Sequence, residues 1–144
     1  STGRSTFEIS GVPARALEVE SGGREQLRKR ALAAGYELLE LHGAHGYLLH
    51  SFFTPLVNTR TDQYGGDFEG RSRMMRETVE AVRKVWPERL PLAVRLSVTD
   101  WIDGGLTIDD NIQLAKVLRD LGVDIVDCSG GGATPDGAPG SASD

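Results

Sequence analysis

The chain has 144 residues, of which 39% are hydrophobic and 26% charged, and its net charge is −5. This length suits one domain, and no apolar run approaches the ~20 residues that a membrane-spanning helix needs. The acidic balance gives no basic footprint for nucleic acid, and the single cysteine, Cys128, excludes an internal disulfide. We therefore expect a soluble, cytoplasmic protein whose partners include neither a membrane nor a nucleic acid.

Three segments have the composition and apolar spacing of helices. They are residues 24–35, residues 69–86 and the segment from the cap residue Thr107 to the stop at Gly122. Gly35 and Pro87 end the first two, because glycine suits the position after a helix and proline cannot continue one. Thr107 and Asp110 have the spacing of a capping box, which marks where the third helix begins.

Each predicted helix is followed by a short apolar run that is typical of a buried strand. The runs are residues 36–42, 90–98 and 123–129. Because helices and strands alternate, neighbouring strands should be parallel. Residues 1–23 show no clear period and residues 129–144 are rich in Gly, Ser and Pro, so both ends are expected to be loosely structured. The α/β domain is therefore predicted over residues 24–128.

The predicted connections differ in length on the two sides of the sheet. Helix-to-strand turns are short, whereas the strand-to-helix loops 42–68 and 99–106 are long. Long loops in compact domains are usually functional, and ligands bind at the carboxyl ends of parallel strands. No G-x-G-x-x-G follows a strand, which disfavours an open dinucleotide-binding sheet. A complete (β/α)8 barrel needs about 250 residues, so we predict a partial (β/α)8 TIM barrel.

The stretch HGAHGYLLH (42–50) contains all three histidines of the chain, and Tyr47 lies among them. One interpretation is that His42 and His45 are ordinary hydrogen-bonded loop residues. A second is a metal site, for which His50 would have to supply the third ligand. The third is an active site in which the two imidazoles hold a substrate oxygen and Tyr47 gives up a proton. We favour the third, because two histidines and a tyrosine follow a strand directly.

Arg95 interrupts the apolar strand LAVRLSV, where an unpaired buried charge would be costly. It could form an ion pair with a carboxylate of a neighbouring strand, such as Glu40. Alternatively its planar guanidinium faces an electron-rich ligand at the barrel mouth, and the pyrimidine edge of a flavin fits that description.

Three stretches together resemble the old yellow enzyme family of FMN-dependent ene-reductases, which are (β/α)8 barrels reduced by NAD(P)H. They are ELHGAHGYLLHSFFTPLVNTRTDQYGGDFEGRSR (40–73), LAVRLSVTDWIDGGLT (92–107) and VDIVDCSGG (123–131). The resemblance implies that the chain corresponds to about strands four to six of that barrel. Related dienoyl-CoA reductases and amine dehydrogenases share part of these signatures, but the histidine pair favours the ene-reductases.

The resemblance also implies roles for individual residues. His42 and His45 correspond to the pair that binds the substrate carbonyl, and Tyr47 to the proton donor. Arg95 corresponds to the arginine beside the flavin N1/O2 edge. The expected cofactors are FMN and NAD(P)H, the expected substrate is an α,β-unsaturated carbonyl compound (an enone or enal), and a homo-oligomer is compatible with this. Two alternatives stay open: a non-catalytic barrel fragment that needs the missing strands, and a metal-dependent barrel enzyme.

Overall fold

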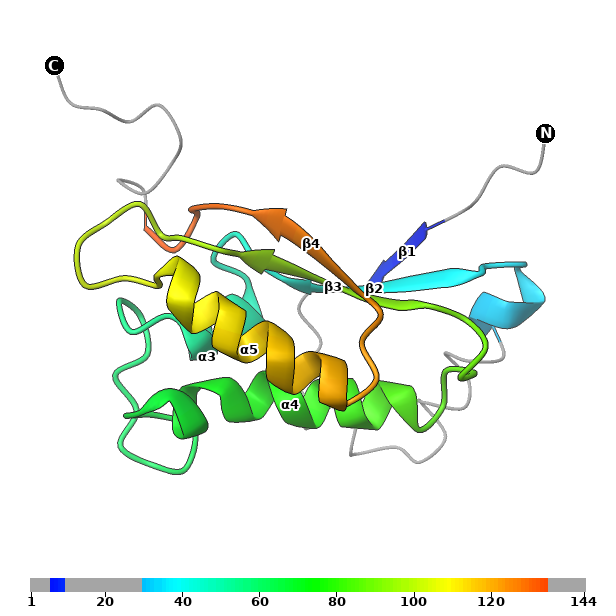
Figure 1. The fold of residues 1–144 in the computed structure, drawn as a ribbon, viewed down its shortest axis with the longest axis horizontal. Helices are drawn as coiled ribbons and strands as arrows, with labels where there is room; N and C mark the ends of the chain where they lie inside the picture. Colours follow the sequence, from blue (N-terminus) through cyan, green and yellow to red (C-terminus); the bar gives the residue numbers. More distant parts are fainter. Residues whose placement is uncertain (1–5, 10–29, 135–144) are drawn as a thin grey trace, which may run out of the picture.

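The computed structural model describes residues 6–9 and 30–134 (Figure 1). Four parallel strands form one sheet in the order β1-β2-β3-β4. The strands are β1 (Thr6–Ile9), β2 (Leu38–Gly43), β3 (Leu92–Ser97) and β4 (Ile125–Ser129). The helices that lie wholly within the described residues are α3 (Leu48–Phe53), α4 (Phe68–Arg83) and α5 (Ile108–Asp120). No helix in the described residues is both long and apolar enough to cross a membrane.

Helices α4 and α5 lie on the same side of the sheet (Figure 1). The core lies between these helices and the sheet, because alternate strand residues point toward them. Its fully buried side chains come from both layers: Leu39, Leu41, Leu92, Val94 and Leu96 from the strands, and Met75, Val79, Val82, Leu114 and Leu118 from the helices. The other face of the sheet carries the polar residues of β2, β3 and β4.

Side-chain caps fix where the two long helices begin. Asp67 accepts a hydrogen bond from the Gly70 N–H at the start of α4, at 2.9 Å. At the start of α5, the Thr107 hydroxyl accepts from the Asp110 N–H, and the Asp110 carboxylate accepts from the Thr107 N–H. The predicted capping box is therefore confirmed. These caps satisfy N–H groups that have no partner within a helix.

The predicted alternation of helices and parallel strands is confirmed from residue 30 to residue 129. Residues 30–33 are helical and end before Gly35, whose φ is +80°, while residues 24–29 of this predicted helix lie outside the described part. Two elements were not predicted. The strand β1 lies within the segment 1–23 and pairs with β2. The described sheet therefore has one strand more than the three expected. The helix α3 lies within the long loop 42–68.

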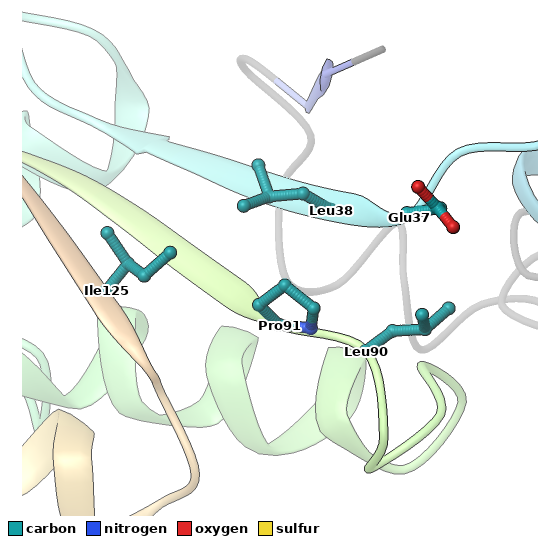
Figure 2. A pocket seen from close by; sticks show the side chains of 5 residues that line it. All are labelled: Glu37, Leu38, Leu90, Pro91 and Ile125. Atoms are coloured by element: carbon teal, nitrogen blue, oxygen red, sulfur yellow. The ribbon is translucent and has the colours of Figure 1, made fainter. Parts of the chain in front are cut away.

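The apolar pocket in Figure 2 lies at the amino ends of the strands. It has a volume of ≈ 280 Å³ and is lined by Glu37, Leu38, Leu90, Pro91 and Ile125. Leu38 and Ile125 begin β2 and β4, and Pro91 precedes β3. Ligands of parallel α/β folds bind at the opposite, carboxyl ends of the strands. The candidate functional site is therefore sought there.

Replacing Thr107 by alanine should destabilise the fold by about 1 kcal/mol, because the capping hydroxyl of α5 is lost. Thr107→Ser keeps the hydroxyl and should retain most of the stability. Chemical denaturation of both variants beside the parent chain measures the difference in the free energy of unfolding. Equal stability of the alanine variant and the parent would contradict the capping role.

Candidate active site

Parallel pairing places three polar residues in one row across the sheet. His42 on β2 lies opposite Arg95 on β3, and Arg95 lies opposite Asp127 on β4. Residues in register on neighbouring strands point to the same face, and their neighbours Leu41 and Leu96 are buried in the core against the helices. The row therefore lies on the face away from α4 and α5, near the carboxyl ends of the strands.

The rings of His45 and Tyr47 pack against the ring of His42, at one end of this row. His42 and His45 have ring centroids 5.2 Å apart with planes at 76°, and His42 and Tyr47 have centroids 4.9 Å apart with planes at 77°. His42 is buried in β2, whereas Tyr47 precedes α3 and is 54% exposed. The Nδ1 atom of His42 accepts a hydrogen bond from the Ala44 N–H at 3.2 Å. The structure thus brings the three predicted residues together, with the tyrosine open to solvent.

His45 and Gly46 form a tight turn in the left-handed region, with φ of +56° and +77°. A residue other than glycine pays about 1–2 kcal/mol for this conformation, so the surroundings must hold His45 in place. Its N–H donates to the Ser97 hydroxyl at 3.0 Å, and its Nε2 lies 2.5 Å from the Ser129 hydroxyl. Residues of β3 and β4 therefore orient the backbone and the ring of His45.

The glycine-rich segment after β4 packs against this turn. A Cβ atom on Gly46 would lie 2.2 Å from the carbonyl oxygen of Gly132, so only glycine allows the approach. The Ser97 hydroxyl donates to the Gly131 carbonyl at 2.8 Å, and the Gly131 N–H donates to the Thr99 carbonyl at 2.8 Å. Up to residue 134 the predicted loose tail is therefore an ordered wall of the site, and residues 135–144 lie outside the described part.

Arg95 has a carboxylate partner, but this is Asp127 on β4 and not the Glu40 that the sequence suggested. The Nε atom of Arg95 lies 3.1 Å from Asp127 Oδ2, which is an ion-pair distance. The contact lacks hydrogen-bond alignment, so this buried N–H of Arg95 has no hydrogen-bond partner. A buried donor without an acceptor is costly. An acceptor-rich ligand edge, such as that of a flavin, would fit here, so Arg95 suits the cofactor that the resemblance implied.

His50 has different hydrogen-bond partners from the other two histidines, although it is near them in sequence. It is 1% exposed, its Nδ1 accepts from the Gly46 N–H at 2.8 Å, and its Nε2 lies 2.9 Å from Asp100 Oδ1. Both ring nitrogens are therefore in use, which leaves none for the metal site considered above. Among residues 6–9 and 30–134, no three His, Cys, Asp or Glu side chains are grouped to hold a metal ion.

Asp100 is a hub of this buried network that the sequence did not reveal. Besides His50 at Oδ1, its Oδ2 accepts from the Thr54 hydroxyl at 2.6 Å and from the Leu106 N–H at 2.8 Å. Burial by itself raises the pKa of Asp100, but the hydrogen bonds from His50, Leu106 and Thr54 outweigh it and hold the pKa below its usual range. Asp100 therefore stays ionised in the folded protein.

The N-x-R-x-D-x-Y-G-G signature forms a turn that bonds to itself. The Asn58 side chain donates to the Tyr64 carbonyl at 2.7 Å and accepts from the Arg60 N–H at 3.0 Å. Asp62 accepts from the Arg60 side chain and from the Tyr64 N–H. A Cβ atom on Gly65 would lie 2.0 Å from the Arg60 carbonyl oxygen, which explains the first glycine of the signature. These contacts assign the signature a role in loop structure.

Trp101 is a second residue at the mouth that the sequence analysis did not single out. It follows Asp100 in the loop after β3, its φ is +62°, and it is 64% exposed. Its indole lies close to Gly130, since a Cβ atom there would approach Nε1 to 2.8 Å. Trp101 therefore flanks the same glycine-rich segment that packs on the His45 turn.

Comparison with known proteins decides the family. The model of the NADH:flavin oxidoreductase / NADH oxidase family matches residues 25–135. The chain belongs to this family. It is 51% identical over 107 residues to the NADPH dehydrogenase of Bacillus velezensis, which covers 74% of this chain and 31% of that protein. The chain therefore spans about a third of the length of this relative.

Solved structures share the fold of this chain over most of its length. The old yellow enzyme homologue from Zymomonas mobilis is 32% identical with a TM-score of 0.64, over 79% of this chain and 32% of that one. A complex of 2-naphthoyl-CoA reductase with 2-naphthoyl-CoA is 29% identical with a TM-score of 0.70, over 83% of this chain and 18% of that one. The resemblance to old yellow enzymes is therefore confirmed, and family membership implies FMN and NAD(P)H as cofactors. Which strands of a barrel the α/β segment supplies stays a prediction.

The lowered pKa of Asp100 predicts acid sensitivity. Because the folded protein binds this proton less readily than the unfolded chain, Asp100 contributes stability above its unfolded value of ~3.9, and this is lost as pH falls further toward the folded pKa. Asp100→Asn should be less stable than the parent at pH 7, with the two unfolding curves converging below about pH 4. Denaturant titrations across this range measure it.

The matched control is Asp62→Asn. The pKa of Asp62 is also lowered, chiefly by its hydrogen bond to Arg60, but the group is fully exposed. Solvent screens exposed pairs, so this variant should change the acid dependence far less than Asp100→Asn. A pH-independent difference between Asp100→Asn and the parent would contradict the prediction.

Proposed function

We propose that this chain provides the substrate-binding and proton-donating part of an enzyme that reduces the C=C bond of α,β-unsaturated carbonyl compounds with FMN and NAD(P)H. The observation that carries the proposal is the contact of the His42, His45 and Tyr47 rings beside the row that contains Arg95. Family membership supports flavin-dependent oxidoreduction. The substrate class and the role of each residue are our inference.

His42 and His45 would bind the carbonyl oxygen of the substrate. Hydride addition to the β-carbon moves negative charge onto this oxygen, so donors placed there stabilise the transition state more than the ground state. Two imidazole rings packed edge to face, one at the end of β2 and one in the turn after it, suit an oxygen held between them. The loss of one comparable donor costs about 3 kcal/mol in other enzymes.

Tyr47 would protonate the α-carbon. A tyrosine hydroxyl carries its proton at neutral pH, as a general acid must. The ring contacts that of His42, and its exposure leaves the hydroxyl accessible to a ligand at the strand ends. The position at the start of α3 also sets the hydroxyl group on a different element from the histidine in β2, so the two groups can approach a substrate from different sides.

Arg95 would hold the flavin. FMN, when bound, supplies the hydride that it has received from NAD(P)H. The guanidinium of Arg95 offers planar donors and a positive charge to the N1/O2 edge, and its unused buried N–H favours such an acceptor. The ion pair with Asp127 would restrain the orientation of the Arg95 side chain on this face.

A second candidate is a barrel segment that acts only when further strands complete it. The described sheet is open, because β1 and β4 each have one neighbouring strand. The start of β4 is also exposed on the face opposite the helices, as the 44% exposure of Ile125 shows. Open sheet edges tend to pair with other strands, which favours this candidate.

The decisive experiment inserts residues 25–135 of this chain into the Bacillus velezensis NADPH dehydrogenase in place of the matching segment, and the resulting chimera is called the exchange enzyme. FMN titration of the 144-residue chain itself is done in parallel. Enone-dependent NADPH oxidation by the exchange enzyme supports the proposed function. FMN binding by the isolated chain would count against the second candidate. FMN binding by the exchange enzyme but not by the isolated chain would support it. An exchange enzyme that binds FMN and is reduced by NADPH, yet never reduces enones, would overturn the proposal.

Tyr47→Phe in the exchange enzyme should slow reoxidation by an enone by about 10²–10⁴-fold, the usual contribution of a general acid. Reduction by NADPH should change little, because that step needs no proton from Tyr47. Stopped-flow absorbance of the flavin separates the two half-reactions. Equal rates of parent and variant in both half-reactions would remove Tyr47 from this role.

Arg95→Met should weaken FMN binding about 10- to 100-fold, since charge-assisted hydrogen bonds contribute ~1.5–3 kcal/mol. Arg119→Met is the control, because Arg119 is an exposed arginine of α5 paired with Asp120. Fluorescence titration with FMN measures both dissociation constants. Similar affinities of the two variants would count against the contact between Arg95 and the flavin.

A further inference from the structure

The buried pair of His50 and Asp100 is bonded to the turn that carries His45 and Tyr47, although the proposed reaction does not use it. His50 lies in α3 and is 1% exposed, and Asp100 follows β3 and is 0% exposed. Ionisable side chains are rarely buried to this extent unless they are paired. A pair that leads directly to the backbone of a site suggests a role in that site.

The contacts of His50 specify its tautomer. Ionised Asp100 can only accept hydrogen bonds, so the 2.9 Å contact to its Oδ1 requires the proton of His50 on Nε2. The Nδ1 atom is then a bare acceptor, and the Gly46 N–H donates to it at 2.8 Å. A ring with protons on both nitrogens would set two donors against each other. Asp100 therefore selects the form of His50 that can hold Gly46.

Gly46 lies between the two site residues of this turn, His45 and Tyr47. His45 and Gly46 are both left-handed, and each backbone N–H of the turn has its own acceptor. The His45 N–H donates to Ser97, the Gly46 N–H to His50, and the Tyr47 N–H to the Ala44 carbonyl at 3.2 Å. The bond to His50 thus fixes the middle peptide of the segment that presents the His45 and Tyr47 rings.

We propose that His50, oriented by Asp100, is a positioning residue that holds the Gly46 peptide and so aligns His45 and Tyr47 toward one substrate. This inference rests on the proposed function for its catalytic meaning. Its structural content, a relay from Asp100 through His50 to Gly46, can be tested separately. The arrangement resembles the way an acceptor behind a histidine sets tautomer and orientation in metal sites.

Asp100→Asn in the 144-residue chain is the sharpest test. Asp100 Oδ2 accepts from Thr54 and Leu106, so an asparagine would keep its oxygen there and turn its NH₂ group toward His50. The His50 proton should then move to Nδ1, opposite the Gly46 N–H. Nitrogen-15 NMR should show the change of tautomer, and hydrogen exchange at the Gly46 amide should accelerate about tenfold or more, as expected for a lost hydrogen bond.

Thr54→Val is the matched control. It removes one hydrogen bond from Asp100 Oδ2 but leaves the contact of Oδ1 with His50. It should therefore leave the His50 tautomer, the Gly46 exchange rate and the nuclear Overhauser contacts between His42 and Tyr47 unchanged. An unchanged tautomer in Asp100→Asn, or equal acceleration at Gly46 in both variants, would overturn the relay.

His50→Gln and His50→Leu extend the test to catalysis in the exchange enzyme. Glutamine can donate to Asp100 and accept from Gly46, whereas leucine can do neither. His50→Leu should slow reoxidation by the enone about 10- to 100-fold, the usual effect of losing an orienting partner, with flavin reduction unchanged. His50→Gln should restore most of the rate. Equal losses in both variants would overturn the positioning role.

The two proposals fail in distinguishable ways. A parent exchange enzyme without enone reduction would remove the proposed function, while the tautomer and exchange measurements on the chain would still decide whether the relay exists. If the parent is active and Asp100→Asn changes neither measurement, the function stands and the relay is wrong.

Discussion

The parallel register between β2 and β3 is the constraint on which the candidate site depends. It sets His42 opposite Arg95, and the same register continued to β4 brings Asp127 beside the arginine. Strand side chains alternate between the two faces, so a slip by one residue would turn all of these groups into the helix layer. The buried leucines on the opposite face, such as Leu39 and Leu41, prevent the slip because it would expose them.

Hydrogen bonds between loops join the segments at the mouth of the sheet. Ser97 joins the His45 turn to Gly131, and Asp100 joins α3 to the loop before α5. The bonding groups come from segments that follow three successive strands. The positions of the site residues therefore depend on hydrogen bonds between these loops. A change in the conformation of one loop should shift the others.

Sequence patterns predicted the parts of this structure that obey local rules. The capping box at Thr107 and the alternation of helices with parallel strands follow from spacing alone, and the motif around His42 pointed to the family. β1 was missed because four residues give no measurable period. The Asp100 network was missed because Asp100 is 50 residues from His50 and 46 residues from Thr54 in the sequence. These residues meet only when α3 and the loop after β3 pack together. The partner of Arg95 depended on the strand register, because Arg95 lies opposite Asp127 of β4 whereas Glu40 lies opposite Ala93.

The two tryptophans of the chain lie in opposite environments. Trp86 is 3% exposed, and its indole N–H donates to the Pro91 carbonyl at 3.0 Å, whereas Trp101 is 64% exposed beside Gly130. The fluorescence of buried Trp86 should therefore have its maximum at a shorter wavelength than that of exposed Trp101. One emission spectrum can therefore follow two events. Quenching of the long-wavelength component from Trp101 would indicate an absorbing ligand at the strand ends, and a shift of the Trp86 component to longer wavelength would indicate unfolding of the core.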